Sequence, residues 1–304
     1  MLEIRPCADR ADDERSVAIY NAVWPWDAVS VAEADSFKAG CLAWIDLLAH
    51  VDGDPIGSGF AAKRLHRPTV GFVLLTVLPD RRHRGAGGAL YRAISDWGRE
   101  NGLEALDAVV HEDDPDSIAF AERRGFVEVE RNSLLVLELA DYEPAAVAPP
   151  AGIEITTWAE RPELARGIYD VACQAYADVP GRGRDQLEPF EHWLEHDMQG
   201  SGDRPDATFV ALDGDDVVGY AKLSFMSAQP DVAFHDMTGV RRDWRGRGVA
   251  GALKRAQIAW AQRSGFTRMQ TQNEARNEPI RRINERLGYR EAPGEVVLRG
   301  PLAP

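Results

Sequence analysis

Two short loops rich in arginine and glycine stand out in this sequence, one over residues 82–88 and one over residues 245–251. Small residues let backbone N–H groups approach a ligand closely, and a helix starting in the loop adds unpaired donors and partial positive charge. Such a loop suits an anion of the size of a diphosphate, with arginine adding further donors. The residues are Arg82, His83, Arg84, Gly85, Ala86, Gly87 and Gly88, then Arg245, Gly246, Arg247, Gly248, Val249, Ala250 and Gly251.

Other interpretations of these loops fit less well. A Walker loop requires G-x-x-x-x-G-K-[ST], and neither loop has that lysine and hydroxyl pair. The run Gly246-x-Gly248-x-x-Gly251 matches the dinucleotide pattern, but five residues, four of them charged, separate it from the strand, and no acidic residue for a ribose follows near Arg268. In the first copy, the run that starts at Gly85 has Leu90 at the position of the third glycine. A tight turn with solvated arginines is the purely structural alternative.

The second half of the sequence repeats the first at a constant shift. Adding 163 to a residue number carries Val77 to Val240 and Gly85 to Gly248. The same shift relates Arg82 to Arg245, Trp97 to Trp260, Gly102 to Gly265 and Gly125 to Gly288, without a gap. Because a solenoid would repeat every 20 to 50 residues or so, we interpret this as an internal duplication of one domain.

Each copy is predicted to place its loop between a strand and a helix. Residues 72–77 are apolar and rich in β-branched side chains, as in a buried strand. After Gly85 apolar residues recur at helical spacing until Gly102, and the second copy does the same until Gly265. The order of elements predicts an α/β (α+β) class in which strand-rich sheets are flanked by helices, twice over.

A stretch rich in alanine and proline separates the two copies. Residues 141–152 are therefore predicted to form a linker. The predicted domains are residues 1–140 and residues 153–304. Each is long enough to build a hydrophobic core of its own.

The composition argues against several classes of protein. No apolar run approaches the ~20 residues that span a bilayer, and residues 1–13 lack the apolar core of a secretory signal. Three distant cysteines offer no disulfide framework and no metal-binding spacing. A formal net charge of −14 repels nucleic acid and anionic membranes and attracts cationic small molecules. We expect a cytoplasmic protein with no nucleic-acid partner and no membrane partner.

The loop sequences resemble a known coenzyme-binding motif. The pattern [Q/R]-x-x-G-x-[G/A], five residues after a strand valine, resembles the pyrophosphate loop of the Gcn5-related N-acetyltransferase (GNAT) family, and both copies fit it. Asn277, followed eleven residues later by Gly288-Tyr289, is similar to that family's N-x-x-A…G-F segment. The resemblance covers about residues 2–139 and 153–300, and it is to the tandem, two-domain members of the family.

This resemblance implies acetyl-coenzyme A as the acyl donor and two GNAT-like domains, each with a mixed, largely antiparallel sheet. In that family a splayed strand offers backbone N–H groups to the thioester, and an asparagine contacts the pantetheine arm. Besides the two loops, the coenzyme-binding residues implied here are Val77, Thr238, Gly239, Val240, Asn273 and Asn277.

The implied reaction needs a base, because an amine must lose a proton before it attacks the thioester. Asp236, His235 and Glu274 are the candidates, on the strand that ends at Val240 or on the next one. Strict alternation would place Asp236 on the same face as Val240 and His235 on the opposite face. Each of the three could instead be an ordinary polar residue of the sheet.

A tyrosine that protonates the departing thiolate in many family members is replaced here. Its position holds Asn284 in the second copy, which can donate a hydrogen bond but not a proton. The first copy has Ala121 there, no acid or histidine in its strand, and Asp114 in place of Asn277. We therefore expect the C-terminal domain to do the chemistry. The N-terminal domain is expected to be degenerate, binding coenzyme A weakly or serving as a scaffold.

A further segment borders the acceptor pocket in the family. Its candidate substrate-binding residues are Tyr176, Asp178, Phe190 and Trp193, with core packing as the alternative for each aromatic ring. The same segment contains the zinc-peptidase pattern H-x-x-E-H at His192–His196. Since no third ligand is evident, we interpret it as an amphipathic surface helix and expect no metal site.

Taken together, the sequence predicts an acetyl-coenzyme A-dependent N-acetyltransferase acting on a small primary amine by direct attack on the thioester. The acidic composition suggests polyamines, aminoglycosides or amino sugars as acceptors. The alternative is a non-catalytic tandem module that binds coenzyme A in a regulatory role. A homodimer is compatible with either prediction.

Overall fold

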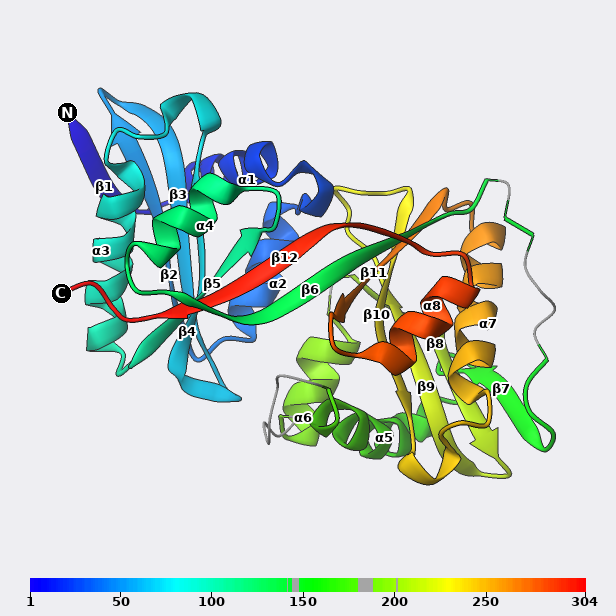
Figure 1. The fold of residues 1–304 in the computed structure, drawn as a ribbon. Helices are drawn as coiled ribbons and strands as arrows, with labels where there is room; N and C mark the ends of the chain where they lie inside the picture. The colour runs from blue at the N-terminus through cyan, green and yellow to red at the C-terminus, as the bar shows by residue number, and fades with distance from the viewer. Residues whose placement is uncertain (141, 144–147, 180–187, 201) are drawn as a thin grey trace. The chain divides into compact units, whose positions relative to one another are not determined.

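The structure is a computed structural model that describes all residues except 141, 144–147, 180–187 and 201. The described residues form two compact units. Unit 1 comprises Met1–Arg131 and Glu295–Pro304, and unit 2 comprises Asn132–Gly294. Each unit is a sheet with helices on both of its faces (Figure 1).

Unit 1 contains the first copy of the repeat. Its elements are β1 (Leu2–Pro6), α1 (Arg10–Val23), α2 (Val31–Ala39), β2 (Ala43–Val51), β3 (Asp54–Arg64), β4 (Arg67–Val77), α3 (Ala86–Glu100), β5 (Ala105–His111) and α4 (Pro115–Glu122). The strand order is β1-β2-β3-β4-β5-β12, where β12 (Arg290–Gly300) is the last strand of the chain. The pair β4–β5 is parallel and the other neighbours are antiparallel.

Unit 2 repeats this plan. Its elements are β7 (Ile153–Thr157), α5 (Ala165–Ala177), α6 (Phe190–Trp193), β8 (Asp203–Asp213), β9 (Asp216–Ser224), β10 (Val232–Val240), α7 (Val249–Arg263), β11 (Arg268–Glu274) and α8 (Glu278–Arg286). The strand order is β7-β8-β9-β10-β11-β6, where β6 spans Val127–Glu138, and β10–β11 is the parallel pair. The mixed, largely antiparallel sheet predicted for each copy is confirmed.

The strands β6 and β12 each contribute to both units. Residues 132–138 of β6 pair with β11 in unit 2, and residues 295–300 of β12 pair with β5 in unit 1. The bounds of the compact units therefore differ from those of the predicted domains 1–140 and 153–304. That one copy carries out the chemistry and the other does not stays a prediction. Of the predicted linker 141–152, residues 141 and 144–147 lie outside the described residues.

Helices cover both faces of each sheet. In unit 1, α3 and α4 pack on one face through Leu90, Ile94 and Ala121, while α1 and α2 cover the other. In unit 2, α7 packs over Ala211 and Val218, while α5 and α6 cover the opposite face. We call the side of unit 2 under α7 the coenzyme side and the side under α5 the acceptor side.

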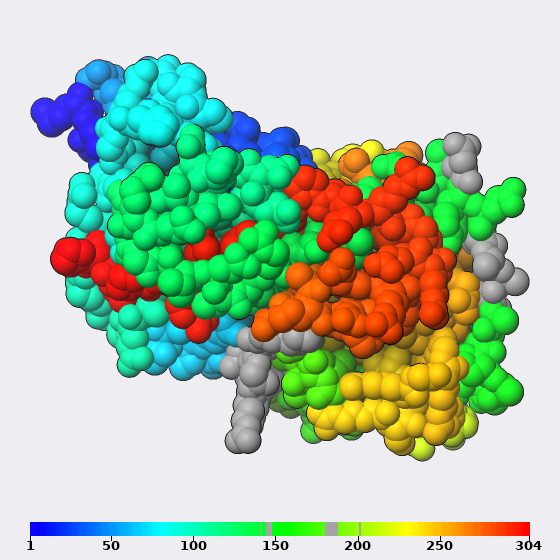
Figure 2. All heavy atoms as spheres, viewed as in Figure 1, coloured from blue at the N-terminus to red at the C-terminus, as the bar shows by residue number. Residues whose placement is uncertain are grey.

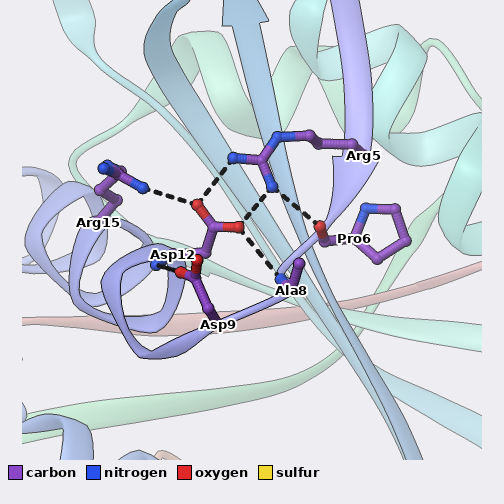
Figure 3. A network of polar contacts seen from close by, with 6 residues as sticks. All are labelled: Arg5, Pro6, Ala8, Asp9, Asp12 and Arg15. Atoms are coloured by element: carbon purple, nitrogen blue, oxygen red, sulfur yellow. Dashed lines mark hydrogen bonds and ion pairs between the residues drawn. The ribbon is translucent and has the colours of Figure 1, made fainter.

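A buried carboxylate fastens α1 to β1 in unit 1 (Figure 3). Asp12 is bonded by both terminal nitrogens of the Arg5 guanidinium, one of them at 2.7 Å, and it also accepts from the Ala8 backbone N–H at 3.1 Å and from Arg15 at 2.8 Å. Asp9 caps the helix by accepting from the Asp12 backbone N–H. The hydrogen bond from Arg5 lowers the pKa of Asp12 well below its usual value.

This network makes a prediction about acid stability. A carboxyl whose pKa is depressed in the folded state contributes stability above its unfolded pKa of ~3.9, and this is lost as the pH falls through the folded value. We expect Asp12→Asn to lower the melting temperature by a constant amount above about pH 5, with the difference from wild type shrinking below about pH 4.

Thermal melts between pH 7 and pH 3 measure this difference. The matched control is Asp35→Asn, because Asp35 forms an exposed ion pair with Arg10 at 2.6 Å, of a kind that contributes little. Equal losses in both variants, or a loss for Asp12→Asn that does not depend on pH, would contradict the assignment.

Candidate active site

Each arginine–glycine loop contains a glycine at which a helix begins. Gly248 has φ +90 as the N-cap of α7, Gly85 has φ +89 as the N-cap of α3, and neither helix has a side-chain cap. Within the described residues, the backbone N–H groups of 246–251 and of 83–88 have no acceptor. A Cβ on Gly246 would meet no other atom within 4 Å. We call each set of N–H groups a cradle, and these donors fit a diphosphate.

The loop before α7 is accessible as well as rich in donors. Residues 245–248 are exposed, and the loop is visible in yellow on the surface in Figure 2. In unit 1 the equivalent of Gly246 is His83, which holds φ +62 without being glycine. Histidine tolerates this left-handed conformation better than most residues, so the first cradle forms at some cost in strain.

The first arginine of each loop holds the loop against its strand. Arg245 Nε donates to the Val240 carbonyl at 3.0 Å, and Arg82 Nε donates to the Val77 carbonyl at 3.2 Å. Each guanidinium is also paired with a carboxylate, Arg245 with Asp178 at 2.8 Å and Arg82 with Asp114 at 3.0 Å. These two arginines therefore position the cradles and are not unpaired charges awaiting an anion.

The parallel strand pair opens toward each cradle. Pairing between β10 and β11 runs from Val232 to His235 on β10 and stops at the pair His235–Thr271. Arg241 N donates to Val218 O on β9, so alternation turns the backbone groups of Val240 and Thr238 toward the gap and those of Gly239 toward β9. This gap, the splay, lies between β10 residues 236–240 and β11 residues 272–274.

A β-bulge at Asp236 distinguishes the two copies. At matching positions, residue numbers in β3 and β9 differ by 162. Between β4 and β10 the difference is 162 up to His235 and 163 from Met237 onward. Unit 2 therefore has one additional residue at this point, which is Asp236, and the register with β9 shifts there. The N-terminal copy has no counterpart of this residue.

The bulge also overturns the expected placement of side chains. Val240 and His235 both lie on the coenzyme side, Val240 in the core under α7 and His235 against Tyr289. Asp236 lies on the acceptor side, where it bonds Lys222. Strict alternation had placed Asp236 with Val240, and it fails because the inserted residue interrupts the pleat.

Asp236 belongs to a charged group on the acceptor side. Lys222 Nζ lies 2.8 Å from Asp236 and 3.0 Å from Asp203, and it also donates to the Asp197 carbonyl. Burial opposes the charge on Lys222, but Asp236 and the neighbouring aspartates outweigh it and raise its pKa. Because one ammonium serves two carboxylates, a negative charge is left over beside the splay. The Asp236 side chain is 37% exposed and the Asp203 side chain 7%, so Asp236 is the accessible one.

The other two candidate bases are occupied or enclosed. Both oxygens of Glu274 are taken by Arg276, Oε1 by the guanidinium at 2.6 Å and Oε2 by the backbone N–H at 2.8 Å. His235 is buried on the coenzyme side, and burial lowers its pKa well below the usual value. The structure thus brings Asp236, and neither His235 nor Glu274, to the acceptor side with an accessible oxygen.

The three predicted asparagines differ in what they bind. Asn284 is completely buried, and its Nδ2 donates to Asn273 Oδ1 at 2.6 Å, while its own Oδ1 has no partner within the described part of the chain. Asn277 occupies the N-cap of α8, and its side chain makes no capping hydrogen bond. In unit 1, by contrast, Asp114 caps α4 by accepting from Ser117 N at 3.0 Å. Asn277 is thus the one with a side chain available for a ligand.

The predicted substrate residues lie on or near α5 and α6. Asp178 accepts two hydrogen bonds of 2.8 Å from Arg242, and this pairing lowers the pKa of Asp178 to about 2. Through Arg242 and Arg245, Asp178 therefore holds the loop before α7 in place. Phe190 and Trp193 pack with Tyr169 in the core under α5, where Trp193 is 1% exposed. Tyr176 lies in the last turn of α5.

The H-x-x-E-H pattern brings its two histidines together. The rings of His192 and His196 are 4.5 Å apart, and His192 Nδ1 lies 3.0 Å from Glu188 Oε2. Among the described residues, the group with metal-ligand spacing is instead Cys7, Asp13 and Asp46 in unit 1. Lys38 lies 2.9 Å from Asp46 and 3.4 Å from Asp13, so an ammonium already pairs with both carboxylates.

Sequence reasoning missed two buried lysines of unit 2. Lys222 faces the acceptor side, and Lys254 on α7 faces the coenzyme side. The signal was present, because a lysine inside an apolar strand such as residues 217–223, or at a core position of a helix, is rarely buried without a role.

Comparison with known proteins fits this geometry. The model of the acetyltransferase (GNAT) family matches the chain twice, over residues 10–126 and 166–289. Because these matches cover more than half of the chain, it belongs to this family, and it is an acetyltransferase. The expected resemblance to the tandem type, the group that includes mycothiol synthase, is confirmed.

Individual relatives support the same family. The mycothiol acetyltransferase of Catenulispora acidiphila is 27% identical over 237 residues, which are 74% of this chain and 71% of that protein. A GCN5-related N-acetyltransferase from Sphaerobacter thermophilus has a TM-score of 0.79 at 21% identity, covering 100% of this chain and 96% of its own. A tandem GNAT protein from the clavulanic acid biosynthesis pathway also has a TM-score of 0.79 at 21% identity, and the match covers 100% of this chain and 99% of that one. The two solved structures establish the fold.

Within the described residues, no helix combines the length and the apolar character required of a membrane span.

Proposed function

We propose that this acetyltransferase moves the acetyl group of acetyl-coenzyme A to the nitrogen of a small primary amine, and that the chemistry takes place in the C-terminal half. The observation that carries the proposal is the bulged Asp236, an accessible carboxylate beside a splayed strand pair that leads to a free cradle. The relatives named as mycothiol acetyltransferases support acetyl as the transferred group.

The residues of unit 2 fit the coenzyme along one path. The cradle over residues 246–251 would bind the diphosphate, the splay would accept the pantetheine arm, and Asn277 would bond its amides. The coenzyme supplies an acetyl group activated as a thioester. Thr238 and Val240 turn backbone groups toward the splay, where their N–H groups can stabilise the negative charge that develops on the carbonyl oxygen.

Asp236 binds and deprotonates the acceptor in this proposal. The excess negative charge of Asp236 and Asp203 over Lys222 attracts an ammonium group. Lys222 holds the carboxylate in place, so that its free oxygen can take the proton. This arrangement favours a cationic acceptor, in agreement with the acidic composition of the chain.

The N-terminal half has a cradle but not the remaining parts. Its splay begins after the pair Val73–Ala108, and β4 contains no acid and no bulge there. A Cβ at Gly87 would lie 3.3 Å from the Phe120 ring, which crowds the cradle. We propose that this half is a scaffold or a weak coenzyme site. The cytoplasmic location and the homodimer stay predictions.

Release of free thiol from acetyl-coenzyme A, measured with a panel of polyamines, aminoglycosides and amino sugars, tests the proposal. We expect at least one cationic amine to raise the rate above background hydrolysis, with a mass increase of one acetyl group on its nitrogen. If coenzyme A binds but no amine in the panel releases thiol, the non-catalytic module becomes the better account.

A further inference from the structure

A layer of buried polar side chains lies between α7 and the sheet on the coenzyme side of unit 2. Lys254 and Gln257 come from α7, His235 from β10, and Tyr289 directly precedes β12. Lys254 is 1% exposed and Gln257 is completely buried. Lys254 Nζ is 5.7 Å from the centre of the Tyr289 ring, and the Tyr289 hydroxyl is 3.5 Å from His235 Nδ1.

The matching layer in unit 1 has no lysine, glutamine or histidine. The four positions are occupied there by Val73, Tyr91, Ile94 and Phe126, all members of one core cluster under α3. In unit 2 the apolar side chains under α7 fall into two separate clusters. The one polar side-chain atom among the four, the Tyr91 hydroxyl, donates to the Pro301 carbonyl at 2.7 Å. The fold thus forms without unpartnered polar groups at these positions, and burying such groups costs stability. A layer of this kind, retained in one copy, points to a role in function.

Lys254 differs from the other lysines of the chain. Four of the 35 basic residues are lysines. Lys38 and Lys222 are paired with carboxylates, and Lys63 Nζ donates to the Asn101 carbonyl at 2.8 Å. In the described part of the chain, no carboxylate pairs with Lys254 Nζ. The amide of Gln257 and Nε2 of His235 are buried there without a hydrogen-bond partner. Burial alone lowers the pKa of Lys254 to about 7.

This layer borders the closed end of the splay. His235 is the last β10 residue paired with β11, so it marks the point where the strands separate. A coenzyme bound along the path proposed above would end beside this layer. The nearby Asn284 has no acidic proton, and its amide already donates to Asn273. The groups that remain at this end are the ammonium of Lys254, the hydroxyl of Tyr289 and the imidazole of His235.

We propose that Lys254 donates the proton that the coenzyme A sulfur takes up when it leaves. The assignment rests on the proposed function. In the step, the acceptor nitrogen bonds to the acetyl carbon, the carbon–sulfur bond breaks with its electron pair on sulfur, and Lys254 Nζ passes one proton to the sulfur. Lys254 becomes a neutral amine and takes a proton from water before the next turnover. Since the acceptor ammonium loses two protons, one proton is released overall.

The chemistry of the surrounding groups suits this role. A thiol titrates near ~8.5 and an ordinary lysine near ~10.4, so a lysine made acidic by burial can give its proton to a thiolate, whereas an exposed one cannot do so readily. The groups facing Lys254 are His235 on β10 and Tyr289, which precedes β12. Tyr142 lies near Tyr289, and Arg255 follows Lys254 on α7 and lies near Tyr142. Burial raises the pKa of Tyr289, which makes it the weaker acid.

The first test measures Lys254 in the wild-type, full-length protein without coenzyme. Lysine labelled with ¹³C at the ε carbon gives four signals, and Lys254→Met and Lys63→Met identify two of them. We expect the Lys254 signal to titrate near pH 7. A Lys254 midpoint above pH 9 would overturn the proposal whether or not an acceptor amine has been found.

The second test separates proton donation from structure. Lys254→Met should melt at a higher temperature than wild type, since a buried charge is replaced by an apolar chain of similar length, and its affinity for coenzyme A should change less than about threefold. We expect kcat with acetyl-coenzyme A to fall about 10²-fold. With an S-aryl thioacetate, whose thiolate leaves without a proton, the two proteins should have similar kcat/KM.

Lys63→Met is the matched control because it removes the same charge from unit 1 and should leave all of these values unchanged. If Lys254→Met loses the same activity with both acyl donors, or loses none with acetyl-coenzyme A, the proposed role of Lys254 is overturned. A failure of the proposed function looks different, because then the wild-type protein itself releases no thiol with any amine.

Discussion

Replacing Asp236 by asparagine should lower kcat for acetyl transfer by about 10³-fold and leave the affinity for coenzyme A within about twofold. Asparagine keeps the size of the side chain and can still accept a bond from Lys222, but it cannot take a proton from the acceptor amine. Because Asp236 lies on the acceptor side, away from the cradle, coenzyme binding should not depend on it. Steady-state thiol release and calorimetric titration measure the two quantities.

Two further variants sharpen this prediction. Asp206→Asn is the matched control, because Asp206 lies on β8 in an exposed pair with Arg204 at 2.7 Å and should leave kcat unchanged. Asp236→Glu retains the carboxylate and should recover part of the activity. If Asp236→Asn retains more than a tenth of the wild-type kcat, another group is the base and the bulge has a structural role.

Deleting Asp236 tests the role of the bulge directly. The N-terminal copy shows that β3 and β4 pair in one register from Gly57 to Ala62 without this residue. The deletion should therefore yield a folded protein in which Met237 follows His235 in regular alternation. Far-ultraviolet circular dichroism and the melting curve should stay close to those of wild type, while thiol release is lost. A deleted protein that keeps its activity would show that Asp236 is dispensable.

The repeat and the loops could be predicted from sequence because their signals are local. A glycine at the start of a helix and an apolar strand before it are encoded within about fifteen residues, and both copies carry them in the same register. The N-caps at Gly85 and Gly248 and the helices that follow therefore formed as expected. The same reasoning failed at β10, because a one-residue insertion in a strand leaves no mark in a polar/apolar pattern until both copies are aligned through their partner strands.

The exchange of β6 and β12 between the units could not be predicted. Both strands contain a short apolar run, residues 134–137 in β6 and 296–298 in β12, and both follow a helix and a glycine. Nothing local therefore tells which of them pairs with β5 and which with β11. The buried lysines illustrate a second limit. Lys222 and Lys254 occupy positions at which the first copy has Phe60 and Tyr91, and only the assembled sheet reveals that one lysine is surrounded by carboxylates and the other by none.

Replacing Gly248 by valine should weaken coenzyme A binding by at least about 10²-fold, whereas Gly85→Val should leave it nearly unchanged. The two glycines form a closely matched pair, with φ +90 and +89, each as the N-cap of a 15-residue helix. A Cβ would reach no protein atom closer than 3.9 Å at either position. Both variants should therefore lose similar stability, about 1–3 kcal/mol from backbone strain.

What separates the two variants is the ligand, because the added side chain enters the space that a diphosphate would occupy only in the half that binds it. Calorimetric titration with coenzyme A and thermal melts of both proteins measure the two effects side by side. If only Gly85→Val loses affinity, coenzyme A binds in the N-terminal half, and Asp236 is then not the base. If neither variant loses affinity, the N–H groups at the helix starts do not bind the diphosphate, and the path proposed for the coenzyme is wrong from its first contact.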